Sequence, residues 1–456
     1  MPRLPKLTPE TLQFVLLSFE GPDQYSMAGG LGVRMKELGL ELARQGFNTH
    51  HIFIGDPSKP ARSHPHKNLT LHRWCRWLSE RHPSGVYDGE ESKLLDWNNS
   101  VPPFVTSELV RPAAQEGKLT AVLAEEWHTA FCTCQLSDQL WRAGLRDQAI
   151  ILWNANNIMG FDRIDWGRLN YCSQITAVSR YMKHLMWTRG VNPLVIPNGI
   201  PADRIRKLPE QSIKALRAAI GVDEVLFKIG RWSPDKRWNM AIEALAAERL
   251  RGRSISMVIR GGIEPHALEV LHNAHTRGLK IVDLRLPEKT SEAIAAFNQA
   301  PRADIYNVLS FMTDDIISLF YAAADAVLAN SGHEPFGLVG LEVMAAGGMA
   351  FVGSTGEDYA IPWLNGVVLD SDDPAEICVA LQHLREQPQA RVQMRREAKA
   401  TAENYTWKKI VEDALLQKLK YTAVRQDVRV ASWPLLGSIA YEHGTMPAGK
   451  TPGTAC

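Results

Sequence analysis

The sequence predicts two α/β domains, each built on a mostly parallel β-sheet wrapped by helices. Short apolar segments alternate with segments of helical periodicity along most of the 456 residues, and this alternation is typical of parallel sheets. A cluster of proline, asparagine and glycine at 192–201, NPLVIPNGIP, divides the alternation into two series. Two such series with a linker between them indicate two Rossmann-like domains, and the length allows two or three domains.

The first series begins with a buried strand at 14–20, FVLLSFE. A polar, glycine-rich loop separates this strand from a helix at 33–46, which Gly46 closes. Apolar segments predict four further strands in this half, at 50–55, 119–126, 149–156 and 175–179. The second series contains six apolar segments, at 225–230, 254–262, 303–312, 324–332, 348–356 and 366–370. Helical segments such as 238–250 separate them, and a last amphipathic helix is expected at 406–424.

The composition is that of an ordinary soluble globular protein, with 45% hydrophobic and 22% charged residues. A net charge of +1 gives no reason to expect nucleic acid or a membrane surface as a partner. The first ten residues lack the apolar core of a signal peptide, and no run of about 18 apolar residues predicts a transmembrane segment. The six cysteines are widely spaced, which favours free thiols in the cytoplasm over a disulfide framework. Cys132 and Cys134 have no second pair of matching spacing with which to bind a metal.

The segment SGHEPFGLVGLEVMAAG, residues 331–347, places Glu334 and Glu342 around seven residues that are nearly all apolar or glycine. It follows a predicted strand and becomes helical from Phe336 on, so Glu334 lies in a loop at the carboxyl edge of the sheet, where ligands bind. Gly337 lets a ligand approach the backbone closely, and the free N–H groups of a helix start suit a phosphate. Carboxylates accept hydrogen bonds from sugar hydroxyl groups. A capped helix with two solvated glutamates is an alternative that these residues alone leave open.

The E-x7-E spacing, with Pro-Phe-Gly-Leu after the first glutamate, resembles the signature of retaining glycosyltransferases with the GT-B fold. These include glycosyltransferase family 4 and the glycogen and starch synthase group. The resemblance implies that Glu334 contacts the donor sugar and that Glu342 binds the ribose hydroxyls. It also implies that three backbone amides reach sugar and phosphate oxygens, those of Phe336, Gly337 and Leu338.

Arg231 and Lys236 lie in the loop that follows the first strand of the second half, in the segment GRWSPDKR. Two cations five residues apart before a helix can hold a diphosphate and balance its growing charge as it leaves. Basic residues in a loop are otherwise simply solvated. The segment is similar to the G-R-x4-K segment of the same family, which implies that both residues stabilise the departing nucleoside diphosphate.

Two segments of the first half also resemble this family. SMAGGLGVRM is similar to its glycine loop, which implies that the amides of Gly29 and Gly30 pass close to the donor phosphate and the acceptor. Glycogen and starch synthases carry a lysine where this chain has Met27, and this departure weakens a polymer-synthase assignment. AEEWHTA is similar to the H-D-W-H-x-A segment, which implies that His128 faces the donor sugar, although Glu125 replaces the first histidine.

The resemblance as a whole implies a retaining transferase that moves a hexosyl group from a UDP-, ADP- or GDP-linked sugar to a sugar or another hydroxyl acceptor. It implies catalysis without a metal ion or a bound cofactor. Residues 1–199 would form an acceptor-binding domain and residues 200–405 a domain that binds the nucleotide sugar. Residues 406–425 would form a helix that crosses back to the first domain, and residues 426–456 a loosely ordered tail.

Three alternatives agree with parts of the sequence. A GT-B epimerase would consume a nucleotide sugar without an acceptor, and a non-catalytic sugar-binding module would bind without turnover. An NAD-dependent oxidoreductase is disfavoured, because Gly30 and Gly32 are not followed by a third glycine at the dinucleotide-binding spacing. The histidine- and tryptophan-rich stretch 64–97 receives no role, since a metal site there would lack a clear third ligand.

Overall fold

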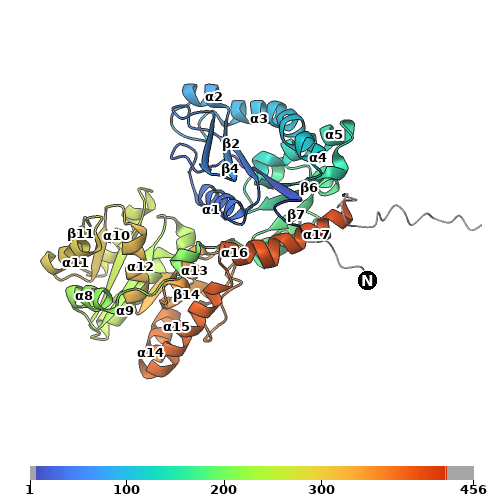
Figure 1. Cartoon of the computed structure of the whole chain (residues 1–456). Helices are drawn as coiled ribbons and strands as arrows, with labels where there is room; N and C mark the ends of the chain where they lie inside the picture. The colour runs from blue at the N-terminus through green and yellow to red at the C-terminus, as the bar shows by residue number, and fades with distance from the viewer. Residues whose placement is uncertain (1–6, 427, 429–456) are drawn as a thin grey trace, which may run out of the picture.

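The computed structural model describes residues 7–426 and residue 428, which form two α/β domains (Figure 1). Each domain is a mostly parallel sheet with helices packed on its faces. The last helices of the chain leave the second domain and run along the underside of the first (Figure 1). The arrangement confirms the fold class that the alternating sequence pattern predicts.

The N-terminal sheet has eight strands in the order β3-β4-β2-β1-β5-β6-β7-β8, and only the edge pair β3 and β4 is antiparallel. Its central strands are buried along their whole length, as expected for parallel strands covered on both faces. The register sets Leu16 of β1 beside His51 of β2 and Leu123 of β5. The strands are β1 (Leu12–Leu17), β2 (Thr49–Ile54), β3 (Arg62–His66), β4 (Leu69–Trp74), β5 (Leu119–Glu125), β6 (Ala149–Ala155), β7 (Gln174–Ala177) and β8 (Leu194–Val195).

The helices of the N-terminal domain connect these strands and cover both faces of the sheet (Figure 1). Pro102 and Pro103 lie at the end of α3, where the helix continues as the π-helical turn η1. A proline has no N–H to donate to the preceding turn, so the regular hydrogen-bond ladder is interrupted there. The helices are α1 (Gly30–Arg44), α2 (Arg76–Arg81), α3 (Glu90–Phe104), η1 (Val105–Val110), α4 (Arg111–Gln115), η2 (Trp127–Thr129), α5 (Ala130–Arg142), η3 (Arg146–Gln148), η4 (Phe161–Arg163), α6 (Trp166–Cys172) and α7 (Arg180–Trp187).

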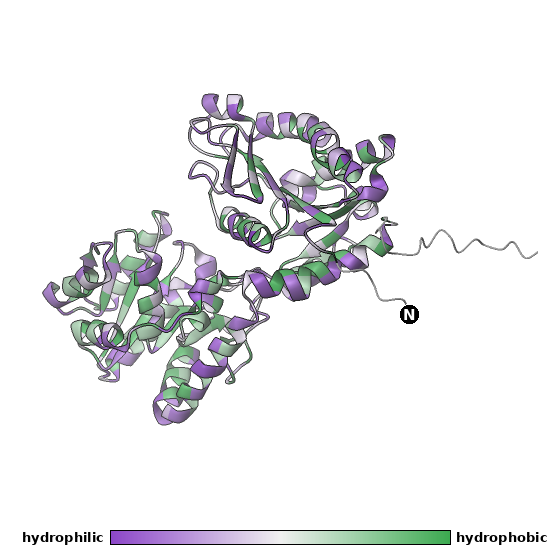
Figure 2. Cartoon of the chain, viewed as in Figure 1, coloured by the Kyte–Doolittle hydropathy of each residue, from purple (hydrophilic) through white to green (hydrophobic). Residues whose placement is uncertain are grey.

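The C-terminal sheet has seven parallel strands in the order β11-β12-β10-β9-β13-β14-β15. These strands are β9 (Glu224–Ile229), β10 (Ile255–Arg260), β11 (Ile281–Leu284), β12 (Ile305–Val308), β13 (Ala326–Ala329), β14 (Ala350–Gly353) and β15 (Val367–Leu369). The helices are η5 (Ala202–Arg204), α8 (Glu210–Ile220), η6 (Pro234–Lys236), α9 (Trp238–Leu250), α10 (His266–Thr276), α11 (Thr290–Gln299), α12 (Asp314–Ala323), α13 (Leu338–Ala345), α14 (Pro374–Glu386) and α15 (Pro388–Glu403). Apolar residues concentrate on the strands and on the inner helix faces (Figure 2).

The chain crosses between the domains twice, at 196–201 and at 404–407. The two crossings lie side by side, because Ile200 N–H donates to Tyr405 O at 2.9 Å and Trp407 N–H donates to Ile200 O at 3.0 Å. A Cβ at Gly199 would lie 2.6 Å from the Trp407 ring, so this close approach requires glycine. The last helical segment comprises α16 (Trp407–Lys409), the π-helical turn η7 (Ile410–Leu415) and α17 (Leu416–Arg425), and its apolar residues pack with β1, β5 and α1 of the first domain.

Four strands, β3, β4, β8 and β11, appear where the sequence pattern predicts none. β3, with the sequence RSHPH, has no apolar alternation to reveal it. It is an exposed edge strand whose register with β4 shifts between Ser63 and His66, and edge strands and bulges are where a proline such as Pro65 is tolerated. β4 lies beside β2 and buries Leu69, Leu71 and His72. The first part of the histidine-rich stretch 64–97 is therefore part of a sheet.

Among residues 7–426 and 428, no helix is both long and apolar enough to cross a membrane. The same part of the chain contains no group of three or more histidine, cysteine, aspartate or glutamate side chains placed to hold a metal ion. The tail predicted for 426–456 lies, apart from residues 426 and 428, outside the described residues.

Candidate active site

Three loops, at the carboxyl ends of β9, β13 and β14, lie at one edge of the C-terminal sheet. Two of them carry charged residues that the sequence motifs single out. The loop after β9 carries Arg231 and Lys236, and the loop after β13 carries Glu334. Lys236 Nζ donates a hydrogen bond to Glu334 Oε2, and it lies 3.4 Å from Asp235 Oδ2. The ligand-binding edge of the sheet therefore holds an ammonium group and a carboxylate in contact.

The loop after β14 fixes the backbone around Glu334. Thr355 Oγ1 accepts a hydrogen bond from Glu334 N–H at 3.0 Å and donates to Glu334 O at 3.3 Å, and Gly356 N–H donates to the same oxygen at 2.8 Å. A Cβ at Gly356 would lie 2.2 Å from Glu334 O, so the two loops meet at a distance that only glycine allows. Glu334 thus lies on a backbone that two adjacent strands hold in place.

Helix α13 begins directly after this loop. Its N-cap is Gly337, whose φ of 78° is in the left-handed region that favours glycine. No described group accepts a hydrogen bond from the N–H groups of Phe336, Gly337 or Leu338, while the Phe336 side chain is buried against Tyr359 and Tyr405. Free N–H groups at a helix start bind anions. We call the set of Arg231, Lys236, Glu334 and these three amides the Glu334 cradle.

The two cations of the cradle differ in their surroundings. Arg231 is exposed, and its guanidinium has no hydrogen bond or ion pair among the described residues. Lys236 is half-buried and bound to Glu334. The next residue, Arg237, was not expected to matter, yet it has a φ of 49°, an ion pair with Asp372 and a buried Nη1 without a partner. A non-glycine residue in this conformation is strained, and such residues concentrate at functional sites.

Glu342 lies one turn into α13 and is half-buried. Tyr321 Oη donates a hydrogen bond to Glu342 Oε2 at 3.2 Å. Burial raises the pKa of Glu342, and the positive charge of Arg204 partly offsets the rise. Glu342 lines a small pocket at the junction of the domains, together with Arg34, Asn198, Arg204, Leu338 and Trp407.

The glycine loop of the N-terminal domain is held by a residue that the sequence pattern did not single out. Glu20, which follows β1, accepts hydrogen bonds on Oε2 from Ala28, Gly29 and Gly32 N–H at 3.2, 2.9 and 3.1 Å. Tyr87 Oη donates to its other oxygen at 2.7 Å. A carboxylate of the chain itself therefore already satisfies the Gly29 amide that was expected to approach a phosphate, whereas a Cβ at Gly30 would meet nothing within 4 Å.

His128 lies in η2 and is only 5% exposed. Its ring stacks on Phe19 and Trp127, at centroid distances of 4.4 and 3.9 Å, and Nε2 forms a 2.7 Å hydrogen bond with Glu90 Oε1. Burial lowers the pKa of His128, although the Glu90 carboxylate opposes this effect. A neutral His128 donates from Nε2 to Glu90 and keeps an acceptor at Nδ1, which is buried without a partner.

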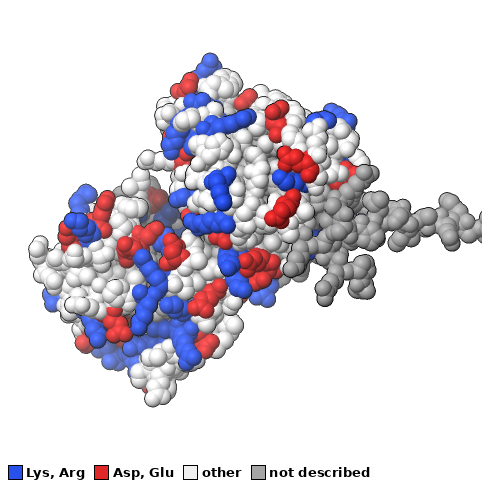
Figure 3. Space-filling model, viewed as in Figure 1, with Lys and Arg blue, Asp and Glu red and all other residues white. Residues whose placement is uncertain are grey.

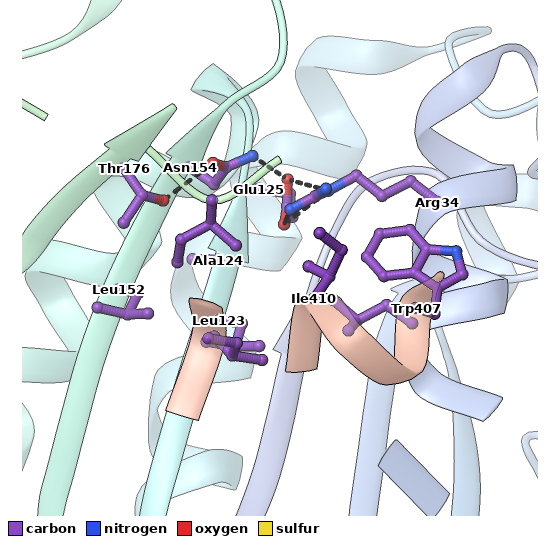
Figure 4. Close-up of a pocket in the computed structure, with 12 residues that line it drawn as sticks. Arg34, Leu123, Ala124, Glu125, Leu152, Asn154, Thr176, Trp407 and Ile410 are labelled. Carbon is purple, nitrogen blue, oxygen red and sulfur yellow. Dashed lines mark hydrogen bonds and ion pairs between the residues drawn. The ribbon is translucent and has the colours of Figure 1, made fainter. Parts of the chain in front are cut away.

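Glu125, which replaces the first histidine of the family segment, belongs to a buried ion pair (Figure 4). Arg34 Nη2 lies 3.2 Å from Glu125 Oε1, and the two side chains are 5% and 2% exposed. Asn154 donates to Glu125 Oε2 at 2.8 Å, and Arg34 also donates to Asn198 in the crossing segment. The network therefore joins α1, β5, β6 and the crossing segment, which is a structural role.

Two contacts join α7 of the N-terminal domain to the site loops of the C-terminal domain. Arg180 donates to Asp358 from its backbone N–H at 2.7 Å and from Nε at 3.2 Å. Tyr181 Oη lies 3.3 Å from His333 Nδ1. His333 precedes Glu334, so the loop that carries the cradle is itself in contact with the first domain.

On the face seen in Figure 3, acidic and basic side chains are interspersed over both domains.

A family model described as "Glycosyl transferases group 1" matches residues 212–401, most of the C-terminal domain. The D-inositol 3-phosphate glycosyltransferase of Salinispora tropica is 28% identical over 193 residues, which cover 41% of this chain and 36% of that protein. The chain matches between 36% and 49% of the length of such curated relatives.

Solved structures resemble both domains together. The sucrose-phosphate synthase of Thermosynechococcus elongatus has a TM-score of 0.64 and 15% identity, over 91% of this chain and 100% of that one. The catalytic domain of starch synthase IV from Arabidopsis thaliana, bound to ADP and acarbose, has a TM-score of 0.61 and 15% identity, over 91% and 99% of the two chains. This chain has the GT-B fold.

Within this GT-B chain, the residues singled out by the sequence fall into two groups. Lys236 and Glu334 are in direct contact, and α13 adds the 336–338 backbone and Glu342 to the same edge of the sheet. His128 and the Gly29–Gly30 loop belong to the N-terminal domain, and none of the hydrogen bonds of His128 among the described residues reaches the C-terminal domain. Sequence analysis missed Glu20, because no sequence spacing links it to the glycine loop that it holds.

Proposed function

We propose that the chain is a retaining glycosyltransferase that moves a hexosyl group from a nucleotide-diphosphate sugar to a sugar or another hydroxyl acceptor. The observation that carries this proposal is the Glu334 cradle. Two cations and three free amides suit a diphosphate, and the carboxylate of Glu334 beside them suits a sugar hydroxyl. The match of residues 212–401 to a glycosyltransferase family model supports the same assignment.

In the proposed reaction, the acceptor oxygen forms a bond to the anomeric carbon while the bond from that carbon to the phosphate oxygen breaks. The electron pair of the broken bond stays on the leaving phosphate, where Arg231, Lys236 and the α13 amides balance its charge. The acceptor proton passes to that phosphate oxygen. Attack from the face that the phosphate leaves retains the configuration, and this step follows the precedent of the resembling family.

The contact between Lys236 and Glu334 has a consequence for donor binding. A diphosphate attracts the Lys236 ammonium, and the Glu334 carboxylate is then available to a hydroxyl of the sugar. Donor binding therefore replaces the ion pair between Lys236 and Glu334 with two contacts to the donor, one from Lys236 to the diphosphate and one from Glu334 to the sugar. Glu342 is proposed to hold the ribose, since it lies one turn further along α13 and faces a pocket.

The acceptor is proposed to enter from the N-terminal domain, whose α7 already touches the cradle loops. Closure of the two domains would exclude water, which would otherwise hydrolyse the donor. We also propose a cytoplasmic location, because the five described cysteines, Cys75, Cys132, Cys134, Cys172 and Cys378, are free thiols.

The test is a screen of UDP-, ADP- and GDP-linked hexoses against sugars and small polyols, with released nucleoside diphosphate as the readout. The acceptor set includes D-inositol 3-phosphate, because curated relatives that part of the chain matches carry that name. We expect one donor class to release its nucleoside diphosphate only when an acceptor is present. The product's anomeric configuration, measured by NMR, tests retention.

The same screen separates the alternatives. A sugar-nucleotide epimerase would consume the donor equally well without an acceptor. A sugar-binding module would bind without releasing a nucleoside diphosphate from any donor. Either result, with the protein folded, would contradict the transferase.

A further inference from the structure

Glu357 lies in the loop after β14, directly against the start of α13. A Cβ at Gly337 would lie 2.7 Å from Glu357 Cγ and 2.8 Å from Glu357 Oε1. Only a glycine at 337 leaves room for this side chain, so the carboxyl group sits on the N-cap of the helix. Glu357 and the free amides of the Glu334 cradle therefore share one small region.

The carboxyl group of Glu357 forms no hydrogen bond of ordinary geometry, although the N–H groups of Thr355 and of Glu357 itself lie near it. The residue is 5% exposed, and neither Oε1 nor Oε2 has a hydrogen-bond partner among the described residues. Buried polar groups nearly always have partners, because leaving one unpaired is costly. Ser233 Oγ and Arg237 Nη1, in the loop that carries Arg231 and Lys236, are buried and unpaired as well. In the described part of the C-terminal domain, unpaired buried polar atoms thus concentrate around the cradle, with Arg395 Nε as the other case.

Buried polar groups that lie close together without partners indicate that a polar ligand supplies their missing hydrogen bonds. The ligand proposed for the cradle is a nucleoside diphosphate, and the α13 amides beside Glu357 suit its phosphate oxygens. An ionised carboxylate would repel a phosphate there, whereas a carboxyl O–H would donate to it.

We propose that Glu357 is a donor-site residue whose carboxyl O–H donates a hydrogen bond to a phosphate oxygen of the nucleotide sugar at the start of α13. This inference rests on the proposed function for the identity of the ligand. It adds a third carboxyl group to a site in which the sequence motif supplies two.

The surroundings of Glu357 favour the protonated form. Burial raises its pKa well above the ordinary value, and the negative charge of Glu334 in the adjacent loop raises it further. The ammonium of Lys236 and the nearby N–H groups of Thr355 and of Glu357 itself partly offset this rise. Tyr359, on the same loop, donates its hydroxyl to Gly337 O and is a neutral neighbour.

The test is calorimetric binding of UDP, ADP and GDP to the full chain and to its E357Q and E357A variants. Glutamine keeps a hydrogen-bond donor without a charge, so we expect E357Q to bind within about threefold of the wild type. E357A loses the donor and should bind about tenfold to a hundredfold more weakly, as for a hydrogen bond to a charged group. The exposed carboxylate Glu269 serves as the control, and E269Q should bind as the wild type does.

The pH dependence provides a second measurement that does not depend on E357A being folded. Wild-type affinity should fall as rising pH ionises Glu357, and E357Q should lack this loss. The proposal is overturned if E357A binds as tightly as the wild type, or if E357Q loses as much affinity as a folded E357A. The same loss at rising pH in E357Q and in the wild type would also overturn it. If the wild type binds none of the three nucleotides, the proposed function itself fails and the role of Glu357 fails with it.

Discussion

Lys236 contacts two carboxylates of the site, because its ammonium donates to Glu334 and lies 3.4 Å from Asp235 Oδ2. Arg231, five residues earlier, is exposed and unpaired. The pair therefore provides one cation that is already held in position and one that is free to move onto a ligand. In a leaving-group role, both charges gain importance as the phosphate becomes more negative.

Replacing either cation should therefore affect turnover more than binding. We expect Lys236→Ala and Arg231→Ala each to lower kcat by about 10²-fold or more, the usual cost of removing one charge-stabilising donor. Steady-state release of nucleoside diphosphate measures the change. A variant that altered only KM would contradict the leaving-group role, and Lys289→Ala, an exposed lysine of the same domain, should change neither constant.

The two glutamates of the motif should respond differently to loss of charge. Glu342→Gln is expected to weaken donor and free nucleoside diphosphate alike, by the roughly 1.5–3 kcal/mol of a charged hydrogen bond. Glu334→Gln should lower kcat more than KM and leave nucleoside diphosphate binding nearly unchanged, since the sugar and not the nucleotide is its proposed partner. Calorimetry beside turnover measures both effects. The opposite pattern would mean that the assignments are exchanged.

At the scale of elements, the site is the meeting of loops from neighbouring strands. The sequence could predict where Glu334, Glu342 and the loop of Lys236 lie, because each motif is contiguous and follows a strongly apolar strand, and their roles stay predictions. It could not predict that Glu357 lies against Gly337, since that contact depends on the pairing of β13 with β14. β3 was missed for a related reason: a polar edge strand has no hydrophobic periodicity of its own.

The glycine loop before α1 shows the same dependence on tertiary structure. Glu20 satisfies three N–H groups of the loop and the Tyr87 hydroxyl. Glu20→Ala should lower the free energy of unfolding of the N-terminal domain by about 1–3 kcal/mol, because these groups lose their acceptor. Glu41→Ala on the same α1, which loses a single contact to Gln45, is the control and should stay within about 0.5 kcal/mol. Equal effects of the two variants in denaturant unfolding would contradict the capping role.

At the scale of the whole molecule, the two domains are joined by paired crossings at 200 and 405–407 and by the contacts of Arg180 and Tyr181. The Arg34–Glu125 pair anchors the first crossing through Asn198. The two cations of the cradle, Arg231 and Lys236, belong to the second domain, while the N-terminal domain contacts the loops around them through Arg180 and Tyr181. Closure can therefore change access to the cradle without changing its cations.

These protein cations lead to a prediction about metal removal. Arg231, Lys236 and the α13 amides can neutralise a diphosphate without a divalent ion. We expect turnover to persist at a similar rate after EDTA treatment and dialysis, and added Mg²⁺ or Mn²⁺ to change it less than twofold. Activity that EDTA abolishes and either ion restores would contradict this expectation.

The stability of the chain should fall in acid because of three histidines of the N-terminal sheet. Burial lowers the pKa of His50 to about 4 and those of His51 and His72 to about 3, from an ordinary value of 6.5. His50 Nδ1 and His72 Nε2 lie 3.1 Å apart, so a proton on one ring also disfavours a proton on the other. Below pH 6.5 these histidines bind protons in the unfolded chain but stay neutral in the folded chain. Each histidine then lowers the free energy of unfolding by up to about 1.4 kcal/mol per pH unit until its folded pKa is reached.

Denaturant midpoints of the N-terminal domain, measured at falling pH, should decline more steeply in the wild type than in the double variant His50→Gln, His72→Gln. The exposed His275→Gln is the control and should follow the wild type, and an unchanged slope in the double variant would assign the acid sensitivity to other groups.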